Sequence, residues 1–180
     1  MLMTVEELRR YMETDEDDQV LEARLQALES LIRGYTHNHF TVRHTARLAD
    51  IVGGTFTLDE TSDFEPGDTV QVSGDRNHGL YTVDEAAATS FTVLEKTYDE
   101  LDAFVVKVKY PMDVKLGAVA LLKWDLTGRD KAGVQSESIS RHSVTYADQT
   151  AENTAAGYPA VLMGFLQPYM CARFGRGVKL

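Results

Sequence analysis

The chain has 180 residues, a formal net charge of −10 at pH 7 and one cysteine, Cys171. A chain of this length buries roughly 70% of its extended surface on folding, so its core needs neither a disulfide nor a metal. Duplex DNA binding depends on neutralisation of phosphates by Lys and Arg, so the acidic balance argues against a DNA-binding module. The amino terminus does not resemble a signal peptide, and we expect cytosolic expression.

The amino-terminal segment predicts two helices. Thr4 and Glu7 have the spacing of a capping box, which predicts a short helix from Val5 to about Met12. The acidic run 14–18 supplies carboxylates for the start of a second helix, where the helix dipole favours them. That helix carries an amphipathic stripe formed by Leu21, Leu25, Leu28, Ile32 and Tyr35.

From Arg43 to Tyr110 the spacing of apolar residues becomes typical of strands. Short strands joined by glycine-rich turns predict a small barrel or rolled sheet. Because helical sequence flanks this module on both sides, we interpret it as an insertion whose two ends lie close together. The predicted strands are Thr55–Leu58, Thr69–Ser73 with Val70 and Val72 on one face, Leu80–Val83, Ser90–Leu94 and Phe104–Tyr110.

The second half begins with a helix over 113–126 that is apolar on nearly all sides, which places it at the centre of a bundle. No helical periodicity is visible between Thr127 and Gly157, and within this stretch 134–146 predicts an extended polar strip that is paired from outside. A last helix is predicted from Tyr158 onward, kinked or broken at Pro168.

These elements predict an α+β fold, a small helical bundle of about four helices with an inserted small β-barrel-like module. We expect residues 1–42 and 111–180 to form the helical core, 43–110 the module, and 129–157 the extended strip. The uncharged run 153–172 is long enough to span a bilayer, but its glycines and prolines favour a buried or interface helix.

Catalytic motifs are absent from the sequence, so we expect no enzyme activity, no cofactor and no metal. His37, His39 and His44 lack the neighbouring Cys or Glu of a metal site, which leaves a metal-dependent hydrolase as a remote third alternative. The serines of the polar strip lie beside His142 but lack the Gly-x-Ser-x-Gly elbow of a nucleophile. The basic end of the chain allows two interpretations of equal weight, a cationic helix end or a surface that docks to an acidic partner.

Four pieces of the sequence together resemble a known protein family. They are the capped helical pair 4–35, the apolar helix ending in Leu122-Lys123-Trp124-Asp125, the strip 134–146 with its Ser-Glu-Ser-Ile and Ser-Val-Thr-Tyr segments, and the closing element Leu166-Gln167-Pro168-Tyr169. In this order they resemble the head–tail connector (adaptor, head-completion) proteins of long-tailed phages and Gram-positive prophages. The resemblance covers roughly 1–42 and 109–180 and does not cover the β module.

This resemblance implies a structural virion protein, made in the bacterial host cytoplasm, that forms a homo-oligomeric ring between portal and tail. The ring would extend the DNA channel without specific DNA binding or membrane contact, and would bind the portal protein and a stopper or tail-completion protein. Candidate subunit-interface residues are Ser136, Glu137, Ser138, Ile139, Ser143, Val144 and Tyr146. Candidate portal-docking residues are Tyr169, Met170, Arg173, Phe174, Arg176 and Lys179.

The alternative from another class is a binding protein in which the β module recognises a peptide or a glycan. The helices would then serve as its scaffold.

Overall fold

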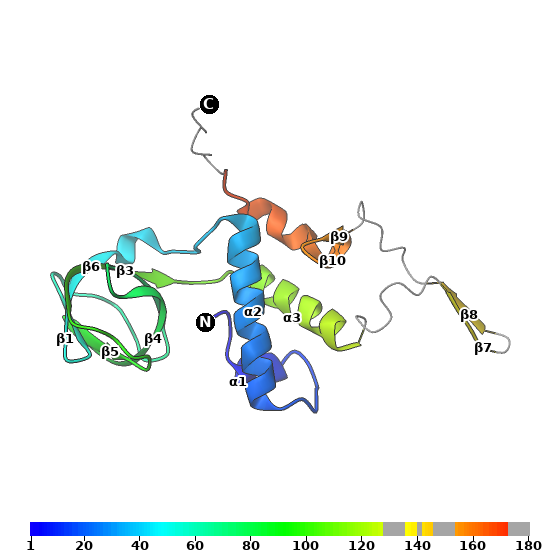
Figure 1. Ribbon diagram of the computed structural model, residues 1–180, viewed down its shortest axis with the longest axis horizontal. Coiled ribbons are helices and arrows are strands. Elements are labelled where there is room, and N and C mark those ends of the chain that lie inside the picture. The colour runs from blue at the N-terminus through cyan, green and yellow to red at the C-terminus, as the bar shows by residue number, and fades with distance from the viewer. Residues whose placement is uncertain (128–135, 140–141, 146–153, 173–180) are drawn as a thin grey trace. The chain divides into compact units, whose positions relative to one another are not determined.

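The computed structural model describes residues 1–127, 136–139, 142–145 and 154–172 (Figure 1). The chain divides into two compact units. Unit 1 consists of Met1 and His39–Tyr110, and unit 2 of Leu2–Asn38 and Pro111–Leu180. Within the described residues, no helix has both the length and the apolar character needed to cross a membrane.

Unit 1 is a closed barrel of antiparallel strands. The spatial order is β1-β2-β5-β4-β3-β6, and the pairing of β1 with β6 closes the barrel. A closed barrel has no free edge at which a further strand could add. A single 3-10 turn, η1 (Arg43–Thr45), precedes the strands, which are β1 (Arg47–Val52), β2 (Thr55–Leu58), β3 (Thr69–Ser73), β4 (His78–Ala87), β5 (Ser90–Val93) and β6 (Glu100–Val108).

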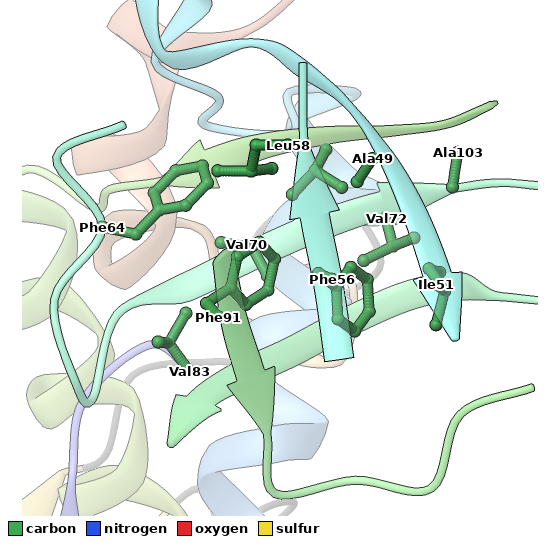
Figure 2. Close-up of a cluster of buried hydrophobic side chains, with 11 residues drawn as sticks. Ala49, Ile51, Phe56, Leu58, Phe64, Val70, Val72, Val83, Phe91 and Ala103 are labelled. Carbon is green, nitrogen blue, oxygen red and sulfur yellow. The ribbon is translucent and has the colours of Figure 1, made fainter. Parts of the chain in front are cut away.

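Aromatic and aliphatic side chains fill the barrel interior (Figure 2). Phe56 and Phe91 stack with their ring centroids 4.5 Å apart, and Phe64 meets Phe91 edge-on at 5.3 Å. Such ring pairs stabilise a core beyond the burial of their area. Val70 and Val72 both lie in this core, which confirms the face predicted for them. The other members are Ala49, Ile51, Leu58, Val83, Ala103 and Val105.

The two ends of unit 1 lie side by side, as expected. The Lys109 N–H donates to the Phe40 carbonyl at 2.9 Å, and Thr41 forms an isolated β-bridge with Val108. The Phe40 and Tyr110 rings lie 4.8 Å apart. The chain therefore enters and leaves the barrel at one place.

Unit 2 begins with the two predicted helices, α1 (Val5–Arg9) and α2 (Asp18–Thr36). The Thr4 hydroxyl accepts the N–H of Glu7 at 3.1 Å, which caps α1 as its spacing predicted. The helix α2 ends at His37, which adopts the left-handed conformation with φ 52°. Four members of its predicted stripe are buried, namely Leu21, Leu25, Leu28 and Ile32.

The third helix, α3 (Met112–Thr127), follows the predicted apolar run and contacts α2, α4 and η3. The Phe165 ring lies directly over Gly117, where a Cβ atom would stand 2.5 Å from the ring. Near the other end of α3, the Trp124 ring lies 5.3 Å from Tyr158. The helix therefore packs along its length against the carboxy-terminal segment.

The prediction of one helix from Tyr158 onward was wrong, although a break caused by Pro168 was expected. A two-stranded hairpin, β9 (Thr154–Ala155) and β10 (Tyr158–Pro159), leads into one α-helical turn, α4 (Ala160–Met163), and then a 3-10 helix, η3 (Gly164–Tyr169). Pro168 has no N–H to donate to the Gly164 carbonyl, and its ring would clash with that carbonyl in an α-helix. The α-helix therefore ends at Met163, directly before Gly164, whose carbonyl Pro168 cannot bond.

The predicted fold class was also wrong. The dominant element is a closed barrel of six strands, not a small module inserted into a helical bundle. Of the four α-helices in the described residues, two are short, with 5 residues in α1 and 4 in α4. The prediction counted the apolar carboxy-terminal segment as a full helix and gave too little weight to strands whose individual signals are short.

Candidate assembly surfaces

The polar strip forms a β-hairpin, β7 (Ser136–Ile139) and β8 (His142–Thr145), drawn as two paired arrows in Figure 1. Its register pairs Ser136 with Thr145 and Ser138 with Ser143. Neither strand pairs with any other strand of the described chain, so both outer edges of this sheet are unpaired there. We expected the strip to be an extended segment paired by another chain, but in the structure its two strands pair with each other.

The structure brings most of the candidate interface residues into this hairpin. Ser136, Glu137, Ser138 and Ile139 form β7, and Ser143 and Val144 belong to β8. Tyr146 lies outside the described residues. Pairing opposes Ser136 to Thr145 and Glu137 to Val144, so residues from the two ends of the strip become neighbours.

The second candidate surface, the carboxy-terminal segment, is tied to α2 and α3 within unit 2. The Tyr169 hydroxyl donates to the Asp113 carboxylate, with oxygen–oxygen distances of 2.7 and 2.8 Å. The Asn38 side-chain amide donates to the Tyr169 carbonyl at 3.2 Å, and the Cys171 N–H donates to the Thr36 carbonyl at 2.8 Å. These contacts fix where the segment leaves unit 2.

Tyr169 therefore has an internal role in addition to the docking role predicted for it. The hydrogen bond to Asp113 raises the pKa of the Tyr169 phenol above its ordinary value, helped by burial and by the Asp113 charge. Met170, the next docking candidate, is exposed. The other four candidates, Arg173, Phe174, Arg176 and Lys179, lie outside the described residues.

A tight turn that the sequence did not predict lies at the start of the carboxy-terminal segment. Ala156 and Gly157 have φ values of 51° and 83°, which suits the two-residue connection between β9 and β10. The Tyr158 side chain is buried, and its hydroxyl donates to the Asp125 carboxylate at 2.6 Å. The signal was weak because Ala-Gly is a less typical turn than Asn-Gly or Asp-Gly.

In the barrel, the Glu100 carboxylate organises the loop between β3 and β4. It accepts the N–H groups of Asp75, Arg76 and Asn77, and also the Asn77 side-chain amide at 2.7 Å. Burial alone would raise the pKa of Glu100, but these hydrogen bonds, first those from Asn77, outweigh it and lower the pKa. The buried Asn77 also bonds Tyr98 through both ends of its amide.

Beside this loop lies a pocket of about 490 Å³ that belongs entirely to unit 1. It is lined by Ile51, Val52, Asp75, Arg76, Asp99, Glu100 and Leu101. Leu101 and Val52 are exposed, as are Leu48 and Phe104 on the same two strands, β1 and β6. Sequence reasoning missed this surface, although apolar residues at both alternating positions of 47–52 and 100–105 could have indicated it.

The three histidines weighed as metal ligands are divided between the two units. His37 caps α2 in unit 2, whereas His39 and His44 belong to unit 1. Across the residues that the structure describes, no group of three or more His, Cys, Asp or Glu side chains could hold a metal ion.

No protein-family model matches this chain, and no curated protein matches it either.

Proposed function

We propose that the protein is a structural component of a phage head–tail junction, where copies of it assemble into a ring between portal and tail. The observation that carries this proposal is the β7–β8 hairpin, whose strands pair only with each other in the described chain. A hairpin of two strands is marginally stable by itself in water. It gains stability when a neighbouring chain covers it or pairs with one of its edges.

The order of elements supports the same proposal. A capped helical pair, a further helix, a polar hairpin and a short closing helix follow one another, as in the resemblance described above. A ring is a head-to-tail assembly, so each copy needs two different complementary surfaces. The hairpin supplies one of them, and the exposed Met170 with the basic residues that follow it supplies a docking element for the portal.

The charge of the chain suits a passage for DNA. With a net charge of −10, the protein repels phosphates, so a channel built from it would let DNA move without retaining it.

The test mixes the purified protein with its cognate portal and follows ring formation by electron microscopy. Val144→Asp, in β8, should abolish co-assembly, because a charge would have to be buried at the subunit contact. Val161→Asp is the matched control: Val161 is 85% exposed on α4 of the same unit, and it belongs neither to the hairpin nor to the docking candidates, which begin at Tyr169. If the wild type does not co-assemble, or a phage that lacks the gene makes normal tailed, DNA-filled particles, the proposal is wrong.

A further inference from the structure

The outside of the barrel carries an apolar surface, the β1–β6 patch, formed by Leu48, Val52, Leu101 and Phe104. Their exposed fractions are 45%, 61%, 69% and 44%. Leu48 and Phe104 are direct partners in the register of the two strands. Single exposed apolar residues are ordinary, but here Leu48 pairs with Phe104, and Val52 and Leu101 line one pocket on the same two strands. Exposed apolar side chains gathered in this way indicate an interaction site.

A β-bulge adds Leu101 to this patch. The register of β1 and β6 shifts between Ala49 and Ile51, opposite Asp102, which has φ 57°. The Asp102 N–H donates to the Asp50 carboxylate at 3.0 Å, so the bulge is held by a specific bond. As a consequence, two successive residues, Leu101 and Asp102, are both exposed instead of alternating between the inside and the outside of the barrel. Bulges commonly redirect a side chain at functional sites, and a left-handed non-glycine residue stores strain there.

The surroundings of the patch are acidic. Asp50, Asp75, Asp99 and Asp102 are all exposed, and Arg76 is the one basic residue that lines the neighbouring pocket. The pocket shares Val52 and Leu101 with the patch. An aliphatic partner side chain could therefore enter the pocket while its flanking groups meet carboxylates.

Charge and topology exclude several occupants. A second barrel placed on the patch would bring two sets of aspartates together, and a nucleic acid would be repelled. A strand cannot add to a closed barrel. The occupant must be recognised through its side chains.

We propose that the β1–β6 patch docks a segment of another protein in which aliphatic side chains alternate with Lys or Arg. The aliphatic groups cover Leu101 and Phe104, and the cations pair with Asp50, Asp99 and Asp102. This inference does not depend on the head–tail proposal, because the barrel lies outside the part of the chain on which that proposal rests.

The experiment uses the full chain and a fluorescein-labelled peptide in which lysine alternates with leucine, with binding measured by fluorescence anisotropy. Leu101→Ser should weaken binding about tenfold, the loss expected when one buried leucine is removed. Leu94→Ser is the matched control, since Leu94 is 67% exposed elsewhere on the barrel, and it should bind like the wild type.

The charge requirement has its own matched pair. Asp102→Asn keeps a side chain that tolerates the left-handed conformation and should weaken binding about twofold to threefold. Asp84→Asn, at an exposed position on β4, should change nothing. A peptide in which glutamate replaces lysine should not bind.

Methyl NMR spectra of the unmodified protein test the location directly, whether or not the variants fold. Addition of the lysine–leucine peptide should shift the methyl signals of Leu48, Val52 and Leu101 but not that of Leu94. Equal shifts at Leu94, or equal affinities of the Leu101→Ser and Leu94→Ser variants, would overturn the proposal and indicate unspecific attraction to an acidic protein.

Discussion

Two glycines in the helices of unit 2 give a matched test of its packing. Gly34 lies in α2, and a Cβ atom added there would meet no other atom within 4 Å. Gly117 lies in α3, where the same atom would stand 2.5 Å from the Phe165 ring. Substitution by alanine therefore gives both helices the same gain in propensity, but only one of them gains a clash.

The expected free energies of unfolding follow from these geometries. Gly34→Ala should stabilise the protein by about 0.5–1 kcal/mol, the usual difference between glycine and alanine in a helix. At Gly117 this gain is offset by overpacking, which costs about 1–3 kcal/mol, so Gly117→Ala should be destabilised by about 1 kcal/mol. The difference between the two variants isolates the ring contact.

Urea unfolding, followed by the fluorescence of the single tryptophan, Trp124 on α3, measures both variants. The double variant Gly117→Ala with Phe165→Leu should recover most of the loss, because a smaller and more flexible side chain can move aside. If Gly117→Ala is as stable as Gly34→Ala, the Phe165 ring does not lie on α3 and the packing described for the closing segment is wrong.

Three further substitutions test single contacts by chemical unfolding. Glu100→Gln should lower stability by about 1–2 kcal/mol at pH 7, because it weakens the charge-assisted bonds to the β3–β4 loop. The folded pKa of Glu100 lies below its unfolded value of about 4.3. The stability lost in Glu100→Gln should therefore be full above about pH 4.3 and vanish as the pH falls through the folded pKa. A loss that does not change with pH would contradict the role given to the Glu100 carboxylate. Tyr169→Phe should lose about 1 kcal/mol through its bond to Asp113. The folded pKa of Tyr169 is raised above its unfolded value of about 10. The stability lost in Tyr169→Phe should therefore be full below about pH 10 and shrink as the pH rises through the folded pKa, which unfolding at a series of alkaline pH values would show. Asp102→Ala should cost about 1 kcal/mol because alanine resists a positive φ, whereas Asp84→Ala should stay within about 0.5 kcal/mol of the wild type; equal values would argue against the bulge.

The elements with strong local signals were predictable from the sequence. The stripe of α2 follows helical periodicity, and α3 coincides with a long apolar run. The alternation of Val70 and Val72 indicates a strand with a buried face. Capping at Thr4 needs only residues three positions apart. Each of these signals lies within a few residues of sequence, which explains why the structure confirms them.

The contacts that depend on distant residues could not be predicted in this way. Glu100 binds a loop 23 to 25 residues earlier in the chain, and nothing local marks it as the acceptor. The bulge at Asp102 exists only against Asp50 on another strand. Closure of the barrel likewise depends on the pairing of β1 with β6, so the sequence suggested a small module and missed that the barrel dominates the fold.

The two proposals assign different work to different residues, and this separation can itself be tested. The hairpin candidate Val144 and the patch residue Leu101 belong to different units. Val144→Asp should therefore abolish ring formation with the portal and leave binding of the lysine–leucine peptide unchanged. Leu101→Ser should weaken binding of the peptide and leave ring formation unchanged. An acidic patch disfavours self-association, so it is a poor contact between copies of the chain and a suitable one for a basic partner. If Leu101→Ser also abolishes the ring, the barrel surface joins copies of the chain, and the acidic rim must then meet a basic surface of the neighbouring subunit.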